Sequence, residues 1–535
     1  MTKSLRGLKF SSVIFTLLIS IPMITIFTFL FSGDTENWNH VKETVLFDYI
    51  FNTLYIMIGV GLLTTLLGFS TAYLVSIYKF TGSRFFDLAL VLPFAIPTYI
   101  LAFIYNGMFG ISGNVTGFIL GIFDKNISEL PFFWDIQSIE GAILVMSLVL
   151  YPYVYLVCRT YLSFESSSII EAAQTFNLNT WQILKKVIIP ISRPAIIAGV
   201  TLAIMEAVSD YGTMDYFGVN TFVTGIFRLW EGMGSIEDAS KLASILMTFV
   251  FILIILERFQ RRNKTYKSSG KDFRPITKIQ LKGWHNNVAF IICFLPFFFG
   301  FLLPFIQLIF WFIESYKTVI DEEFLELLFN TILLGLMSAV IITSIALLVV
   351  YNYRMNKDKA SSSFVQIIKL GYSIPGAVVA VGILSFFGII NELYLKLFDN
   401  SFLVSGTLIA ILFGYLVRFI SISINNFEAG FNRIPQSYDD AASISGVGSV
   451  KTFTKVFIPL IKNSAFASFI VIFIEVIKEL PLTMVLRPFD YDTLAIRALE
   501  LNEQAQTIQS AVPSLFIVLI AMISVILLIK NMKKA

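Results

Sequence analysis

Cysteine, histidine and charge are all scarce in this chain. The two Cys (Cys158 and Cys293) and the two His (His40 and His285) lie far apart, which excludes a disulfide framework and a Cys/His metal centre. Only 14% of the 535 residues are charged, whereas soluble globular domains have about a quarter. With 56% hydrophobic residues and a mean hydropathy of +0.79, the composition indicates a membrane protein with many spans.

A nucleotide-binding loop is also missing. Ser269-Gly270-Lys271 resembles the end of a phosphate-binding loop, but Thr265 stands where that motif needs a glycine, so the Walker spacing fails. Neither His lies near a candidate nucleophile on one side of a membrane, which leaves no Ser/His/Asp or Cys/His arrangement. We therefore expect this chain not to be an enzyme.

Apolar stretches predict the membrane-spanning helices, which need ~20 residues each. They lie near 12–31, 52–77, 86–109, 139–160, 191–209, 242–257, 288–313, 328–350, 364–390, 402–424, 464–479 and 511–529. The first stretch is long and lacks an Ala-x-Ala-like exit, so we expect a retained helix rather than a cleaved signal. A basic stretch from Glu257 to Asn287 separates the sixth span from the seventh.

The distribution of Lys and Arg predicts the orientation, because cytoplasmic loops carry an excess of both. With the N-terminus inside, 27 of the 39 Lys and Arg fall in cytoplasmic segments and nine in the opposite loops. Both termini are therefore expected in the cytoplasm. Lys369 and Arg418, near the cytoplasmic ends of their spans, are expected to snorkel to the interface.

The two halves of the chain repeat one another. Asn52-Thr53 matches Asn330-Thr331, and Ile96-Pro97 matches Ile374-Pro375, at the same offset. A parallel duplication in one orientation needs an even number of spans in each copy, and six plus six fits. We predict an all-α polytopic membrane protein of about twelve transmembrane helices in two six-helix halves, with a pathway between them.

This repeat divides the chain into five expected segments. A first transmembrane helix and its outer loop (1–50) precede transmembrane domain 1 (51–257). A basic cytoplasmic linker (258–287) follows, then a seventh helix with its outer loop (288–328) and transmembrane domain 2 (329–535).

A second repeated pattern joins Ser168–Pro190 to Ser437–Pro459. Each copy has a Ser three residues before a carboxylate, the spacing of a capping box at a helix start. A residue that tolerates a left-handed turn follows six positions later, and a Pro stops a second helical run. We predict helix, tight turn and helix in both copies, on the cytoplasmic side.

This pattern resembles the cytoplasmic coupling loop of bacterial binding-protein-dependent ABC-importer permeases, which docks on an ATPase subunit. The resemblance implies the type I importer permease fold in the inner membrane, two copies of a partner ATPase that bind ATP and Mg, and a periplasmic solute-binding protein. This chain would bind no cofactor or nucleic acid itself. The implied docking residues are Glu171, Ala172, Ala173, Asn177 and Pro190 in loop 1, and Asp440, Ala441, Ala442, Gly446 and Pro459 in loop 2. Asn177 replaces the usual Gly, and Asp440 the usual Glu.

The passages 205–230 and 474–500 look most like the ferric-iron branch of that family, through Asp-Tyr-Phe-Gly-Val (215–219) and Lys-Glu-Leu-Pro-Leu-Thr (478–483). Permeases for thiamine, polyamines or phosphonate are related alternatives, and an ion-gradient-driven secondary transporter is a rival from another class. Intramembrane carboxylates are costly unless they are paired or functional. Glu206, Asp210, Glu475 and Glu479 hold equivalent places in the halves and are pathway candidates, with capping and interhelical hydrogen bonding as their alternative role.

Overall fold

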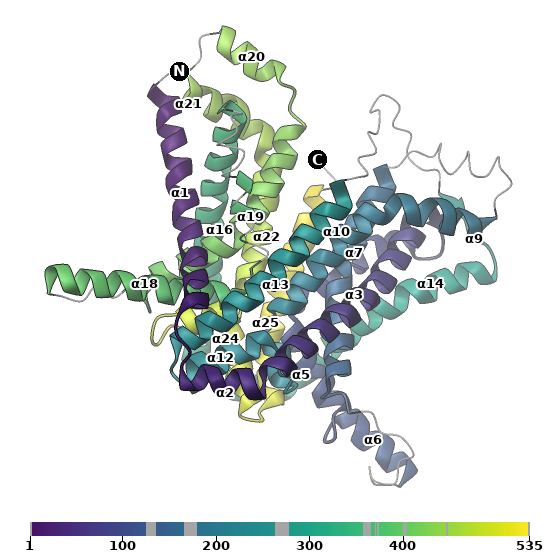
Figure 1. Cartoon of the computed structure of the whole chain (residues 1–535). Coiled ribbons are helices and arrows are strands. Elements are labelled where there is room, and N and C mark those ends of the chain that lie inside the picture. The colour runs from purple at the N-terminus through teal and green to yellow at the C-terminus, as the bar shows by residue number, and fades with distance from the viewer. Residues whose placement is uncertain are drawn as a thin grey trace.

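The computed structural model describes residues 3–124, 135–164, 179–262, 278–356, 365–366, 368–369, 371, 374–399, 404–445 and 448–532. Within these residues, ten helices are long and apolar enough to cross a membrane, or up to twelve if each of two bent pairs forms one span. The structure confirms the all-helical membrane class that the composition predicted (Figure 1).

The elements of the first half come before the basic linker. In order they are α1 (Lys3–Thr28), η1 (Phe29–Phe31), α2 (Glu36–Thr44), α3 (Leu46–Ile77), β1 (Tyr78–Lys79), α4 (Ser83–Ala89), η2 (Leu92–Ala95), α5 (Thr98–Phe109), α6 (Asn114–Phe123), α7 (Ile139–Phe164), α9 (Thr180–Ile183), η4 (Leu184–Ile188), α10 (Ile189–Ser209), α11 (Gly212–Tyr216), α12 (Phe222–Phe227), η5 (Arg228–Gly232) and α13 (Ile236–Arg262).

The second half repeats much of this order. It comprises β2 (Ile279–Gln280), α14 (Trp284–Phe297), η6 (Phe298–Leu302), α15 (Leu303–Val319), α16 (Glu322–Asn356), α18 (Gly376–Phe398), α19 (Leu408–Asn432), α20 (Ser437–Ile444), α21 (Ser449–Thr452), η8 (Phe453–Phe457), α22 (Ile458–Lys478), α23 (Pro481–Leu486), α24 (Leu494–Glu503) and α25 (Thr507–Met532). The strands β1 and β2 form a two-residue parallel pair that ties the end of the linker to the loop after α3.

The third span of each half differs from its prediction as one straight helix. The stretch 86–109 is broken at Ile96-Pro97, where the chain bends by 91° between Ser83–Ala95 and Thr98–Phe123. In the second half α18 begins at Gly376, directly after Pro375. Proline lacks a backbone N–H and forces the preceding residue into an extended conformation, which Ile96 shows with φ −95° and ψ 121°.

The prolines of the coupling loops also correct a prediction, because neither Pro190 nor Pro459 ends its helix. A single helical segment runs over Thr180–Ser209 in the first half and over Val450–Lys478 in the second. Just before each proline lies one turn of π-helix, η4 or η8. The wider turn lets the helix accept a proline ring without ending.

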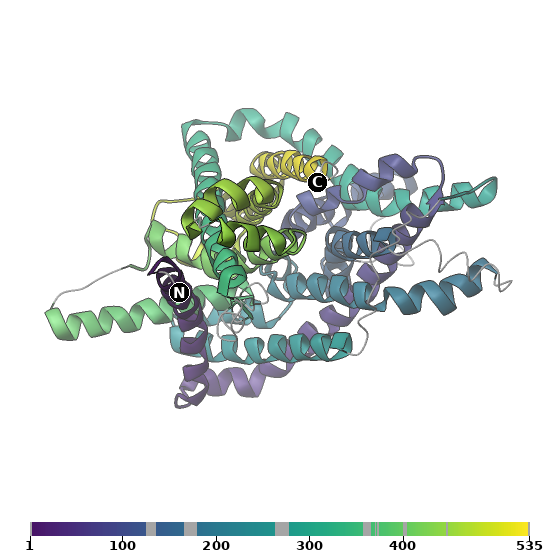
Figure 2. The same ribbon diagram turned by 90° about the horizontal axis from the view of Figure 1, so that it is seen from above.

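The first helix of each half packs on the opposite half. A side chain at Gly382 of α18 would meet the carbonyl oxygen of Pro22 in α1 at 2.8 Å, so the two helices are in close contact. In return, a side chain at Gly300 in η6 would lie 2.6 Å from the carbonyl oxygen of Leu148 in α7. Figures 1 and 2 show α1 beside the green helices of the second half. The halves are interleaved rather than side by side.

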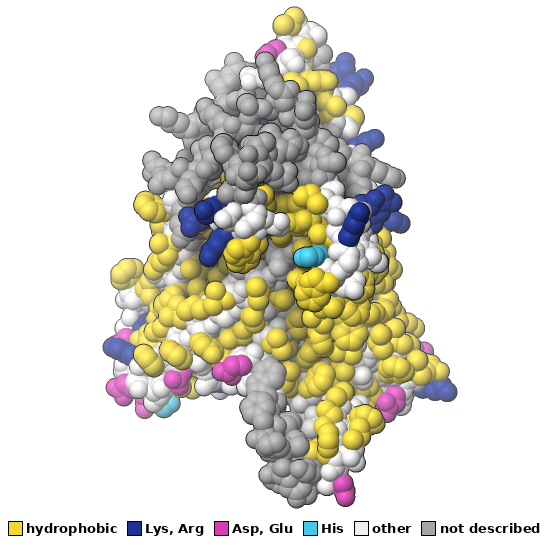
Figure 3. All heavy atoms as spheres, turned by 90° about the vertical axis from the view of Figure 1, so that its right-hand side faces the viewer, with side chains coloured by type: hydrophobic (Ala, Val, Ile, Leu, Met, Phe, Trp, Pro, Cys, Tyr) yellow, Lys and Arg dark blue, Asp and Glu magenta, His cyan; other side chains and the backbone are white. Residues whose placement is uncertain are grey.

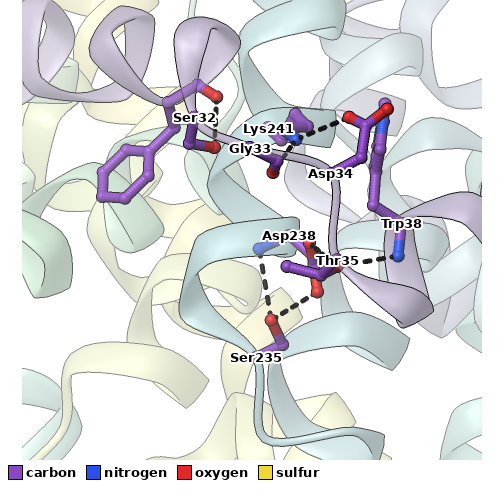
Figure 4. A network of polar contacts seen from close by, with 9 residues as sticks. Ser32, Gly33, Asp34, Thr35, Trp38, Ser235, Asp238 and Lys241 are labelled. Carbon is purple, nitrogen blue, oxygen red and sulfur yellow. Dashed lines mark hydrogen bonds and ion pairs between the residues drawn. The ribbon is translucent and has the colours of Figure 1, made fainter.

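A polar network fixes the segment after α1 to α13 (Figure 4). The ammonium of Lys241, only 3% exposed, donates to the carbonyl of Gly33 at 2.8 Å and pairs with Asp34 at 3.3 Å. The Thr35 hydroxyl donates to Asp238 at 2.7 Å. Since buried charges are stable only when paired, these contacts hold the α1–α2 bend in place.

Both termini lie at the end of the molecule that carries α20, and α6 and α24 lie at the other end (Figure 1). On the face drawn in Figure 3, Lys and Arg gather toward the α20 end, Asp and Glu toward the opposite end, and hydrophobic side chains fill the band between them. A hydrophobic band between polar ends is the surface that a bilayer requires.

Candidate functional site

A cavity of about 90 Å³ lies where the two halves meet. It is bordered by the last turns of α10 and α22, the broken third span of the first half and α19. All four pathway candidates line it, so the fold brings together carboxylates that are up to 273 positions apart. Its lining includes Phe94, Thr98, Tyr99, Tyr153, Glu206, Asp210, Tyr211, Arg418, Glu475, Lys478 and Glu479.

On the second-half side, Glu479 is held by an ion pair with Arg418 of α19 at 2.9 Å. Both side chains are buried, with 6% and 8% of their surface exposed. The same carboxylate oxygen accepts the backbone N–H of Leu482 at 2.9 Å. Arg418 is therefore not at the membrane interface, which corrects the snorkelling prediction. An arginine inside an apolar span is itself a signal of a buried partner.

Gly376 makes room for this ion pair. A Cβ atom at position 376 would overlap Nη1 of Arg418 and lie 2.8 Å from Oε1 of Glu479. The equivalent residue of the first half is Thr98, whose hydroxyl donates to Asp210. Asp210 of the first half therefore accepts a hydrogen bond from a neutral hydroxyl, whereas Glu479 of the second half pairs with a guanidinium. That guanidinium fits only because residue 376 is a glycine.

Asp210 and Glu479 show the capping role that was the alternative for these carboxylates. Each follows the last residue of its span, and each accepts a backbone N–H from the residue three positions later. For Asp210 the donor is Thr213 at 2.8 Å, and the Thr213 hydroxyl lies at 3.1 Å. These contacts fix the turn that leaves each span at the mouth of the cavity.

Glu475 lies one helical turn before Glu479 and faces Lys478. The ammonium of Lys478 lies 3.6 Å from Oε1 of Glu475 and 4.0 Å from the centre of the Phe94 ring. Hydropathy did not single out Lys478, Thr98 or Tyr99, because their role depends on neighbours from other spans. Within the described residues, no three His, Cys, Asp or Glu side chains are placed to hold one metal ion.

The second predicted docking loop forms a helix, α20, at the end of the molecule that carries both termini. Asp440 and Ala441 are exposed and Ala442 is half-buried, as is required of a surface that another protein covers. Ser437 is the first residue of this helix rather than its cap, since the amides of Asp439 and Asp440 donate to the Gln436 carbonyl. Glu171, Ala172, Ala173, Asn177 and Gly446 lie outside the described residues.

Arg354 at the end of α16 holds α20 against the membrane helices. It pairs with Asp439 at 2.7 Å and donates to the carbonyl oxygens of Phe431 and Ile434 at 2.6 and 3.1 Å. Nearby, Lys369 pairs with Glu428 of α19. Lys369 is thus engaged in an ion pair, and its predicted snorkelling is replaced by a contact with a neighbouring span.

Carboxylates also gather at the end of the molecule opposite α20. Burial and the neighbouring Asp215, Glu231 and Glu500 raise the pKa of Glu503. Burial likewise raises the pKa of Asp215, although Arg228 opposes the shift. These carboxylates come from both halves and make the end of the molecule opposite α20 acidic.

Comparison with known proteins places the chain in a family. The family profile described as binding-protein-dependent transport system inner membrane component matches residues 64–262 and 354–534, once in each half. The Fe(3+)-transport system permease protein FbpB 2 of Haemophilus influenzae is 24% identical over 96% of this chain and 97% of its own length. The ferric transport system permease protein FbpB of Actinobacillus pleuropneumoniae is 22% identical over 85% of this chain and 67% of its own.

Another relative matches a smaller share of the chain. The sulfate transport system permease protein CysT of Escherichia coli is 27% identical over 36% of this chain and 71% of its own length. Two copies of the profile agree with a duplicated helical fold. The chain belongs to the binding-protein-dependent inner membrane components of ABC importers, and it is a duplicated, non-catalytic permease.

Proposed function

We propose that this permease moves ferric iron from the periplasm to the cytoplasm. The observation that carries the proposal is the match to an Fe(3+)-transport permease over nearly the full length of both chains. The cavity adds support, because four carboxylates line it. Carboxylate oxygens suit hard cations, and Fe(III) is one by extension of that rule.

The alternative solutes fit this cavity less well. Sulfate or phosphonate would have to pass the four carboxylates that line it, which repel an anion. Thiamine and polyamines are cationic but large. Pockets for drug-sized ligands measure about 300–1,000 Å³, whereas this cavity measures about 90 Å³. Because the chain belongs to the ABC importer family, the family match replaces the hypothesis of an ion-gradient-driven secondary transporter.

The coupling loops suggest how ATP drives the cycle. In this proposal two copies of a partner ATPase, which bind ATP and Mg, grip loops 168–190 and 437–459 and draw them together on closure. A solute-binding protein delivers iron to the outer loops 210–241 and 478–510. In this orientation both termini are cytoplasmic. We keep the proposed division of the chain into five segments, 1–50, 51–257, 258–287, 288–328 and 329–535.

Uptake in iron-starved cells tests the solute. We expect deletion of this gene to abolish uptake of radiolabelled ferric iron and to leave uptake of thiamine and putrescine unchanged, since the cavity favours a small cation. The same chain supplied from a plasmid should restore iron uptake. Unchanged iron uptake together with loss of another solute would overturn the ferric assignment.

Charge reversal tests the docking loops. We expect the double variant Glu171→Lys with Asp440→Lys to lose ATP hydrolysis stimulated by the binding protein, because both loops would then repel their docking groove. Glu322→Lys changes the exposed first residue of α16; it is the matched control and should behave as wild type. A double variant that still responded to the binding protein would remove the docking role.

A further inference from the structure

One buried polar group at the cavity has no partner. The hydroxyl of Tyr99, a residue only 4% exposed, makes no hydrogen bond, although Tyr99 lines the cavity. Asp210 and Glu479, one from each half, are its electrostatic neighbours. A buried hydroxyl without a partner is costly and needs an explanation. A ligand that enters the cavity would supply the missing partner.

The charges around the cavity are unevenly distributed. Four carboxylates line it, two from each half, whereas the basic residues among its described lining are Arg418 and Lys478, both from the second half. The carboxylates therefore outnumber the basic side chains by two. An excess of negative charge in a low-dielectric surrounding attracts a cation strongly.

The two basic residues differ in how firmly they are held. Arg418 lies 2.9 Å from Glu479 in a space that Gly376 keeps open, so it is fixed. Lys478 makes only long contacts, at 3.6 Å to Glu475 and 3.5 Å to the Phe94 carbonyl, both beyond an ordinary N–H···O hydrogen bond. The same ammonium also makes a cation–π contact with the Phe94 ring, whose centre is 4.0 Å away. Lys478 is therefore the exchangeable cation of this site.

We propose that Lys478 is a resident counter-ion of the cavity, and that a small oxygen-seeking cation replaces its ammonium beside Glu475 during transport. The Tyr99 hydroxyl then serves as an additional oxygen donor, and the lysine ammonium leaves Glu475 but keeps its contact with the Phe94 ring. Between cycles the lysine neutralises part of the negative charge, so the empty cavity does not have to hold bare carboxylates away from water.

The size of the cavity limits the cargo. About 90 Å³ holds an ion with a few water molecules but is far below the volume of pockets for organic ligands. In this conformation the cavity has room for a small hydrated ion but not for an organic chelator. This inference rests on the proposed import of iron only for the identity of the ion, because the lysine and the carboxylates define the site for any small hard cation.

Terbium binding to the full-length chain in lipid nanodiscs tests the inference. Tb³⁺ is a hard trivalent ion, and Tyr99, Tyr153 and Tyr211 around the cavity can sensitise its emission. We expect Lys478→Met to tighten Tb³⁺ binding at least about tenfold, because a competing positive charge is removed. Glu475→Gln should weaken binding by at least about the same factor, because it removes an attracting charge.

One matched control and three further variants complete the test. Lys396→Met removes an exposed lysine that pairs with Glu392 outside the cavity, and it should bind Tb³⁺ as wild type does. Lys478→Arg keeps the positive charge and should therefore not tighten Tb³⁺ binding. If Lys478→Met fails to elute as a folded monomer, Lys478→Gln takes its place. Tyr99→Phe should reduce both the affinity and the sensitised emission.

Two outcomes would overturn the counter-ion role. One is equal Tb³⁺ affinity in Lys478→Met and Lys396→Met, and the other is emission that is absent or insensitive to Glu475→Gln. Iron uptake in cells is a separate measurement. Normal iron transport with no effect of Lys478 on Tb³⁺ would reject the counter-ion alone. A Lys478 effect without iron uptake would reject iron as the cargo and leave the cation cavity in place.

Discussion

Replacement of Gly376 by alanine should abolish the folded permease. The new methyl group would occupy the place of the Arg418 guanidinium and leave the buried Glu479 without its partner. Breaking a buried ion pair on one side costs about 3–5 kcal/mol, a large part of the stability of a typical domain. We expect little monodisperse protein in detergent and a strongly lowered melting temperature, as measured by fluorescence-detected size exclusion and thermal unfolding.

A glycine in the same helix provides the control. A Cβ atom at Gly388 of α18 meets nothing within 4 Å, so Gly388→Ala should leave yield and melting temperature unchanged or slightly raised. Arg418→Met combined with Gly376→Ala should not be worse than Gly376→Ala alone, because the clash is removed. Equal melting temperatures for Gly376→Ala and wild type would show that the ion pair does not need this space.

Removal of the Arg354 guanidinium should uncouple the permease from its ATPase. Arg354 joins α16 to α20 through Asp439 and two backbone carbonyls, and its side chain is only 11% exposed. Hydrogen bonds to charged groups contribute about 1.5–3 kcal/mol each, so Arg354→Met should free α20 from the membrane helices. We expect solute uptake to fall at least about tenfold, with basal ATP hydrolysis retained and its stimulation by the binding protein lost.

Arg433 offers a matched comparison for this prediction. It lies next to the same loop and is exposed, so Arg433→Met removes an equal charge without breaking the link to α20. Its uptake and stimulated ATP hydrolysis should equal those of wild type. If Arg354→Met retained full stimulation, the motion of α20 would have to reach the membrane by a route other than α16.

Much of the fold follows from hydropathy alone. A bilayer demands apolar helices of about 20 residues whatever they pack against, so each predicted stretch corresponds to a helix or to a bent pair. The duplication was visible for a similar reason, since the matched pairs Ile96-Pro97 and Ile374-Pro375 each lie directly before the start of a helix, α5 or α18. The capping signal at Ser437 located α20 to within a residue of its first hydrogen bond.

Features that depend on contacts between distant segments were beyond prediction. From sequence alone a proline predicts the end of a helix, yet the helices continue past Pro190 and Pro459 because a π-helical turn lies before each proline. Arg418 reads as a snorkelling side chain until α18 and α22 place Gly376 and Glu479 around it.

The sequence by itself determined that this protein is a duplicated helical membrane protein with a repeated loop pattern, because burial in lipid and helix termination are local requirements. Only the tertiary structure decided which half each first helix packs on and that four carboxylates, Arg418, Lys478 and Tyr99 share one cavity. The physical reason is that a charge in a membrane is stable only beside a partner, and the partner's position is set by the packing of other spans.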